Sequence, residues 1–166
     1  LGKSSGLIGF LFLSLLIFSG DTARFFDRFF GLDKIIKFQR KFALLTMVFV
    51  LAHPIFFILS DWSSLAFLIP NFSALPLALG AMSFYIFMAV MIASKMYKRI
   101  SYNLWQYIHV LTYVLFSFSL YHAFNLGFDS GNLFVRLIYL IMLAAVAIGA
   151  VYRTDYKLKQ RRAGKF

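Results

Sequence analysis

The stretch LWQYIHVLTYVLFSFSLYHA, residues 104–123, decides the fold. It contains no Lys, Arg, Asp or Glu, and its length is that of a helix that spans a bilayer, about 20 predominantly apolar residues. It nevertheless holds two of the three histidines of the chain, His109 and His122; the third, His53, lies in another apolar stretch. Because an ionisable side chain in hydrocarbon is costly and rare, a function is the default interpretation of each.

The composition extends this picture to the whole chain. Hydrophobic residues make up 61% and charged residues only 14%, whereas a soluble domain has about 25% charged residues. Further apolar stretches lie at about 7–18, 42–59, 74–93 and 133–151. We predict an all-α membrane protein in which residues 1–166 form a single domain of five transmembrane helices. The first stretch is short, which suggests a trimmed N-terminus and a sixth helix in the natural chain.

The basic residues predict the orientation. Fifteen of the seventeen Lys and Arg residues fall in three segments that five spans would place on one side of the membrane. They are Arg24, Arg28, Lys34, Lys37, Arg40 and Lys41; Lys95, Lys98 and Arg99; and Arg153, Lys157, Lys159, Arg161, Arg162 and Lys165. The positive-inside rule makes this side the cytoplasm, with the N-terminus outside, in a bacterial inner or plasma membrane. The net charge of +11 is then a topology signal, and we expect no nucleic-acid partner.

Several classes of chemistry are excluded or disfavoured. The chain has no cysteine, which excludes disulfides, thiol catalysis and iron–sulfur ligation. It has no glutamate, and its six aspartates are predicted at helix ends or in loops. We therefore expect no buried carboxylate of the kind that relays protons in transporters.

The predicted topology gives each histidine a depth. With a rise of 1.5 Å per residue from Tyr102, His109 lies about 10 Å and His122 about 30 Å from the inner boundary. His53 lies about 25 Å from a helix entry near Ile36, so it shares the outer half of the bilayer with His122. The two are candidate axial ligands of a b-type haem, and the helix bundle would enclose that haem.

Two points limit this interpretation. Each histidine could instead be a structural residue that is hydrogen-bonded to a hydroxyl or carbonyl group, in a redox-silent membrane scaffold or assembly subunit. His109 and His122 are also about 140° apart around an ideal helix, so they cannot face one neighbour if the helix is straight.

Pro54 is expected to bend or end the helix of His53, and the aromatic connector at residues 21–32 is expected to lie along the cytoplasmic interface.

Four segments of the chain resemble the transmembrane domain of ferric-reductase-like proteins. This superfamily includes NADPH oxidases, ferric reductases and the haem-bearing membrane subunit of the bacterial methionine sulfoxide reductase system. The most specific matches are His-Pro at 53–54 and the Trp-x-x-x-His-(x)12-His run from Trp105 through His109 to His122. The segments are LGKSSGLIGF, FFGLDKIIKFQRKFALLTMVFVLAHP, LGAMSFYIFMAVMIASKMYKRISYNLWQYIH and VLTYVLFSFSLYH.

The resemblance implies an outer haem b between His53 and His122. In members with two haems, a second histidine lies fourteen residues before the outer one, and that position is Gln39 here. The inner site therefore has three readings: His109 binds a second haem, contacts a bridging flavin or quinone, or is a structural hydrogen-bond donor, for example to Gln39. The membrane subunit of the methionine sulfoxide reductase system also lacks a full inner pair, which favours a bridging cofactor.

Other candidate cofactor-binding residues lie near the inner boundary. Trp105 opens the motif that contains His109, and Gln39 is a candidate at the inner site itself. Arg40 and Lys41 could pair with haem propionates or with flavin or quinone head groups. Their simpler interpretation is that they are positive-inside residues.

Oxidase and ferric reductase members continue into a flavin-binding barrel and a nicotinamide-binding domain, whereas this sequence ends at Phe166. The resemblance implies that FAD or FMN and NAD(P)H act through a missing domain or a separate cytoplasmic flavin reductase protein. It implies a membrane oxidoreductase component that moves electrons from cytosolic NAD(P)H, by way of flavin and haem, to an external acceptor. That acceptor is oxygen, ferric iron or a periplasmic redox partner.

Overall fold

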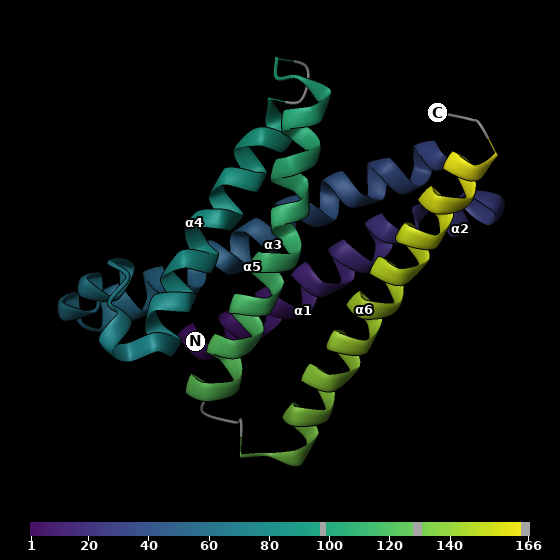
Figure 1. Ribbon diagram of the computed structural model, residues 1–166. Coiled ribbons are helices and arrows are strands. Elements are labelled where there is room, and N and C mark those ends of the chain that lie inside the picture. Colours follow the sequence, from purple (N-terminus) through teal and green to yellow (C-terminus); the bar gives the residue numbers. More distant parts are fainter. Residues whose placement is uncertain (97–98, 128–130, 164–166) are drawn as a thin grey trace.

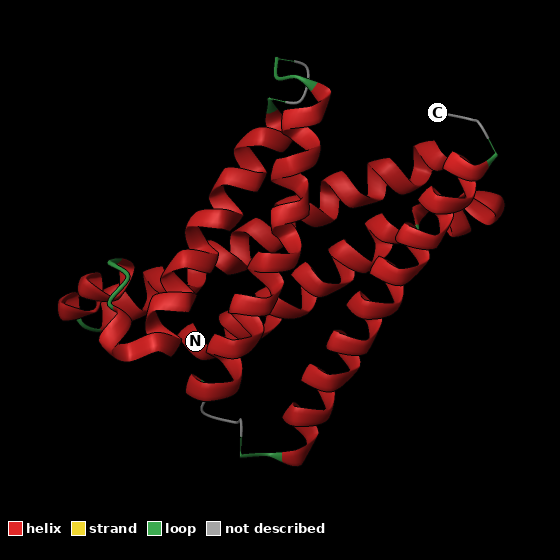
Figure 2. Cartoon of the chain, viewed as in Figure 1, coloured by secondary structure: helices red, strands yellow, loops and turns green. Residues whose placement is uncertain are grey.

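The computed structural model describes residues 1–96, 99–127 and 131–163 (Figure 1). This part of the chain is helical and contains no strand (Figure 2). The α-helices are α1 (Gly2–Asp21), α2 (Ala23–Phe30), α3 (Leu32–Ser60), α4 (Leu75–Lys95), α5 (Tyr102–Leu126) and α6 (Leu133–Arg162), and two short 3-10 helices are η1 (Trp62–Leu68) and η2 (Phe72–Ala74). Five of the α-helices are long and apolar enough to cross a membrane. The prediction of an all-α membrane protein with five spans is confirmed.

Polar side chains begin several of the helices. Ser101 accepts a hydrogen bond from the backbone N–H of Leu104 at the start of α5, and Asn132 accepts one from Phe134 at the start of α6. These side chains satisfy backbone donors that have no partner within the helix. Between α2 and α3, Gly31 has a φ of 80°, a left-handed conformation that glycine adopts without steric cost.

Two of the membrane-spanning helices contain a proline. Pro54 lies inside α3, which continues to Ser60, so the alternative that Pro54 ends the helix is wrong. Its ring removes one hydrogen bond of the helix, but the rest of the helix remains intact. Pro76 lies in the first turn of α4, where the missing N–H has no cost.

The connector at residues 21–32 forms the short helix α2, in which none of the described residues is buried. Its aromatic side chains Phe25, Phe29 and Phe30 are exposed. Arg24 and Arg28 lie on the same short helix. Exposed rings together with basic side chains are typical of a helix that lies in a membrane interface.

Helix α1 is the centre of the packing. It contacts α3, α5 and α6, while α4 packs along α5. In the core, the ring of Phe10 stacks on Phe116 with centroids 5.4 Å apart and meets Tyr139 edge-on at 5.5 Å. The core therefore joins α1, α5 and α6, while many large hydrophobic side chains remain exposed on the outside of the helices, as expected for surfaces that face lipid.

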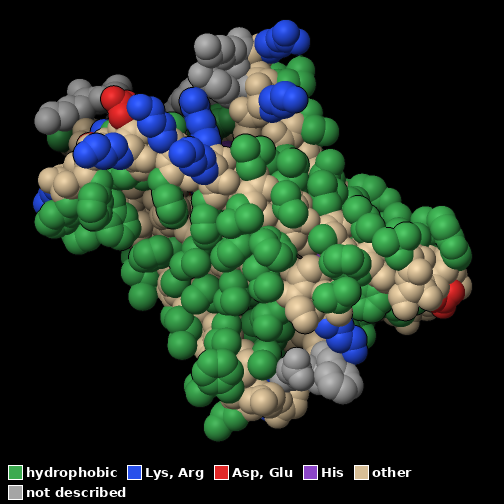
Figure 3. Space-filling view, turned by 180° about the vertical axis from the view of Figure 1, so that it is seen from behind, with side chains coloured by type: hydrophobic (Ala, Val, Ile, Leu, Met, Phe, Trp, Pro, Cys, Tyr) green, Lys and Arg blue, Asp and Glu red, His purple; other side chains and the backbone are tan. Residues whose placement is uncertain are grey.

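The two ends of the helix bundle differ in charge. In Figure 1, α2, the connection from α4 to α5 and the C-terminal end of α6 lie toward one end. The N-terminus and the start of α6 lie toward the other. Most Lys and Arg side chains visible in Figure 3 gather at the first end, above a broad hydrophobic surface. Two of the predicted basic residues, Lys98 and Lys165, lie outside the described part of the chain.

We predict that the basic end is cytoplasmic. The chain has no native cysteine, so single cysteines report without background. Gly131→Cys, at a position with open space around it, should react with a membrane-impermeant maleimide in intact cells. Lys159→Cys, on the exposed basic end of α6, should react only after permeabilisation. The reverse labelling pattern would contradict the orientation.

Candidate functional site

His53 of α3 and His122 of α5 meet in the structure, although 69 positions separate their numbers in the sequence. Their ring centroids are 6.1 Å apart, and the ring planes are 88° apart. His53 lies near the C-terminal end of α3 and His122 near the C-terminal end of α5. Both helices therefore bring an imidazole to the same level, at the end of the bundle opposite the basic residues.

One nitrogen of each ring is fixed by a backbone carbonyl. His53 Nδ1 is 2.8 Å from the carbonyl oxygen of Gly2, and His122 Nδ1 is 2.9 Å from that of Pro76. Because a carbonyl oxygen only accepts hydrogen bonds, each Nδ1 must carry the proton and donate it. Nε2 is then the nitrogen of each ring that can offer a lone pair to a metal. This is the arrangement found around metal-ligating histidines, whose second nitrogen donates to a carbonyl or carboxylate.

A glycine lies against each of the two rings. A Cβ atom added to Gly6 would lie 2.5 Å from His53 Nδ1, and one added to Gly80 would lie 2.3 Å from His122 Nδ1. Both glycines lie inside helices, Gly6 in α1 and Gly80 in α4. Each therefore gives an imidazole the space to reach a carbonyl near the start of the same helix. Neither glycine is among the predicted site residues, although both lie in segments that resemble the transmembrane domain of ferric-reductase-like proteins.

The two histidines line a cavity of about 270 Å³. Most of its walls are apolar, with side chains such as Phe10, Leu13 and Phe87. Its polar lining residues besides the histidines are Lys3, Ser64, Ser83, Ser119 and Tyr139. A largely apolar cavity with a few convergent polar groups is the usual form of a cofactor site.

The inner candidate residues do not form a comparable pair. His109 stacks on Trp105 with centroids 4.8 Å apart, one turn away on the same helix. The Nε2 atom of Gln39 is buried and has no hydrogen-bond partner among the described residues. No hydrogen bond between His109 and Gln39 forms in this part of the chain. Arg40 and Lys41 are exposed.

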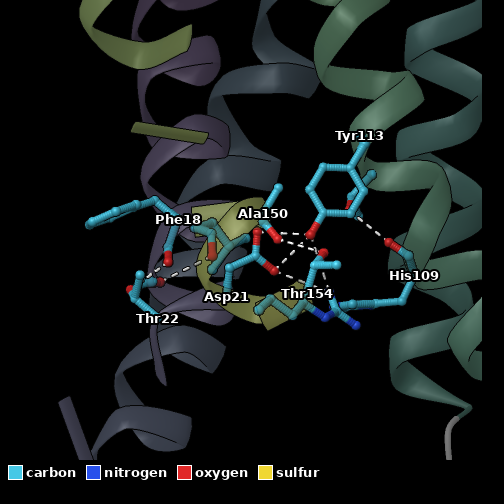
Figure 4. Close-up of polar contacts among 11 residues, drawn as sticks. Phe18, Asp21, Thr22, His109, Tyr113, Ala150 and Thr154 are labelled. Carbon is cyan, nitrogen blue, oxygen red and sulfur yellow. Dashed lines mark hydrogen bonds and ion pairs between the residues drawn. The ribbon is translucent and has the colours of Figure 1, made fainter. Parts of the chain in front are cut away.

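A cluster of polar side chains near His109 was not predicted (Figure 4). The hydroxyl group of Tyr113 donates to the carboxylate of Asp21 at 2.8 and 2.9 Å, and Arg153 Nη1 donates to the same carboxylate at 3.1 Å. The side chain of Asp21 is only 3% exposed. The three residues join α1, α5 and α6, so the expectation that the spans hold no buried carboxylate is wrong.

Asp21 is buried because α1 packs closely against α6. Gly149 of α6 allows close approach to α1, since a Cβ atom there would lie 3.2 Å from Cβ of Asp21. Arg153 lies one turn further along α6 and neutralises the carboxylate. The sequence places Arg153 in the third basic segment, whereas in the structure it lies inside α6 and pairs with a residue 132 positions away. Sequence spacing carries no signal for such a pair.

The comparison with protein families agrees with this architecture. The family described as ferric reductase like transmembrane component matches residues 5–120. The chain belongs to this family. The match includes His53 and His109 and ends two residues before His122. This ferric reductase-like chain is thus an oxidoreductase-type membrane component, in a family associated with haem and flavin electron transfer. The comparisons with curated proteins and with solved structures gave no match.

We predict that the buried cluster stabilises the junction of α1, α5 and α6. Asp21→Ala should lower the free energy of unfolding by about 3 kcal/mol, because it leaves Arg153 and Tyr113 without their shared acceptor. The matched control is Asp155→Ala, which removes the exposed pair with Lys159 on α6 and should have little effect. Thermal unfolding in detergent, followed by circular dichroism, measures both. Equal midpoints for the two variants would contradict the prediction.

Proposed function

We propose that this ferric reductase-like chain, residues 1–166, is a single transmembrane domain that carries electrons through b-type haem. Its electrons come from cytosolic NAD(P)H by way of FAD or FMN. They leave to an external acceptor, which is oxygen, ferric iron or a periplasmic redox partner. The observation that supports this proposal best is the pair His53 and His122, in which both Nδ1 atoms are held by carbonyl groups.

The geometry of the pair fits two axial ligands of one iron. His53 and His122 would hold the iron between their Nε2 atoms, which requires ring centroids about 6 Å apart. The observed separation is 6.1 Å. The hydrogen bonds of the two Nδ1 atoms hold the ring planes 88° apart. A haem with two imidazole ligands supplies reversible one-electron transfer with little change of geometry.

The rest of the outer site would maintain that chemistry. The carbonyl groups of Gly2 and Pro76 would hold the proton of each ring on Nδ1, which leaves Nε2 as the nitrogen that can bind a metal. Apolar side chains around the cavity exclude water, and the dielectric environment of a bound haem affects its reduction potential. The site is built mainly on four long helices, α1, α3, α4 and α5.

The inner half of the domain would receive the electrons. A buried polar atom without a partner requires an explanation, and an absent ligand is one. The orphaned Nε2 of Gln39 therefore favours a bridging flavin or quinone, whose carbonyl oxygens accept hydrogen bonds, over a purely structural role for the inner site. Arg40 and Lys41 are exposed, so they suit a head group or the docking surface of a cytoplasmic flavoprotein rather than a buried haem.

We predict that the purified chain, supplemented with haem, gives a reduced-minus-oxidised spectrum of haem b. His53→Ala or His122→Ala should abolish it, because each removes an axial ligand. The pyridine haemochrome assay should give one haem per chain, and His109→Ala should retain it. Two haems in the parent would contradict the bridging cofactor at the inner site. The absence of any Soret band in the parent would instead support a redox-silent scaffold.

The two glycines give a second prediction. Gly6→Ala and Gly80→Ala should both reduce the haem content strongly, since the added methyl group displaces an imidazole from its carbonyl partner. Gly20→Ala is the matched control in α1, because nothing lies within 4 Å of its added Cβ. Haem absorbance per protein measures all three. Full haem content in Gly6→Ala and Gly80→Ala would show that the rings do not need this space.

A further inference from the structure

One face of α1 forms a wall of the cavity. Lys3, Gly6, Leu7, Phe10 and Leu13 all line it, and their spacing of three and four residues puts them on the same side of the helix. Four of these five residues are apolar. The exception is Lys3, in the first turn of α1, at the end of the bundle where His53 and His122 meet.

Lys3 is closely connected to the ring of His53. Its neighbour Gly2 provides the carbonyl oxygen that accepts from His53 Nδ1, and Gly6, one turn further along α1, lies against the same ring. Lys3 therefore emerges from the backbone beside a proposed axial ligand. Its side chain is exposed at the mouth of the cavity, where a flexible stem can direct the ammonium group.

The described lining of the cavity contains one permanently charged side chain. Of the described residues that line it, Lys3 is the only Lys, Arg, Asp or Glu. Ser64 of η1, itself buried, lines the same cavity. The cavity is thus apolar along most of its walls and cationic at one end. This polarity matches haem, an apolar macrocycle that carries two carboxylates on one edge.

We infer that Lys3 binds the propionate carboxylates of the outer haem and directs them toward the outer end of the bundle, an inference that rests on the proposed function. The bond is an ammonium–carboxylate pair with charge-assisted hydrogen bonds, the stronger class in proteins. Lys3 acts as a positioning residue, because the iron ligands are the two histidines. Its positive charge also stabilises the ferrous state relative to the ferric state, which raises the reduction potential.

The structure offers a matched control at the same end of the bundle. Arg136 lies in the first turn of α6, is exposed and does not line the cavity. Arg136→Gln and Lys3→Gln each remove one positive charge from the outer end. Only Lys3→Gln removes it from the cavity. Lys3→Arg keeps the charge and the ability to bind carboxylates.

The experiment compares the full chain with these three variants, each purified in detergent and loaded with haem. Transfer of haem to an excess of a haem-scavenging apoprotein gives its dissociation rate, and spectroelectrochemistry gives its midpoint potential. Lys3→Gln should release haem about tenfold faster or more, because it loses a hydrogen bond to a charged group. Its midpoint potential should shift to more negative values. Lys3→Arg and Arg136→Gln should remain close to the parent.

Two other outcomes are distinguishable. If the parent binds haem and Lys3→Gln matches Arg136→Gln in both dissociation rate and potential, the role of Lys3 is refuted while the proposed function stands. If the parent binds no haem, the proposed function fails, and the role of Lys3 fails with it. Loss of haem in Lys3→Arg as large as in Lys3→Gln would also refute a carboxylate contact that depends on charge.

Discussion

The structure depends on the need to satisfy two imidazole N–H groups inside an apolar bundle. A buried polar hydrogen without an acceptor is costly, and in a membrane no water is available to replace a missing partner. His53 and His122 solve this by donating to the carbonyl groups of Gly2 and Pro76. These bonds fix the tautomer of both rings. They also require that α1 and α4 pass close to the rings, which only glycine at positions 6 and 80 permits.

A second polar arrangement organises the other half of the bundle. Asp21, Tyr113 and Arg153 connect α1, α5 and α6 by hydrogen bonds and an ion pair. A buried carboxylate is tolerated there because an opposite charge and a hydroxyl group both bind it. The core around Phe10 lies between this cluster and the histidine pair, so α1 is held at both of its ends. The central position of α1 then explains how residues of its first turns come to line the cavity.

The two ends of the domain therefore have different chemistry. The histidine end has two imidazoles held by backbone acceptors, and Lys3 is the one cation among the described residues that line its cavity, which suits a haem with anionic propionates. The basic end has exposed Arg40 and Lys41 and the unsatisfied amide nitrogen of Gln39. These side chains suit an electron donor that is not part of the described chain and binds at the basic end. The two ends together favour one fixed cofactor at the histidine end and, at the basic end, an inner site that a bound cofactor completes.

The sequence by itself determined the five spans and the similar depth of His53 and His122, because hydrophobicity and helical rise are local properties. It did not determine the lengths of the helices, since α1, α3 and α6 extend well beyond the apolar stretches that predicted them. It also determined that Gln39 stands where a second ligand is expected. Only the tertiary structure decided the acceptors of the two rings, which lie 51 and 46 positions away from them. It likewise decided the burial of Asp21 and the place of Lys3 at the cavity. These features depend on which helices pack together, and that choice arises from long-range contacts that no local pattern encodes.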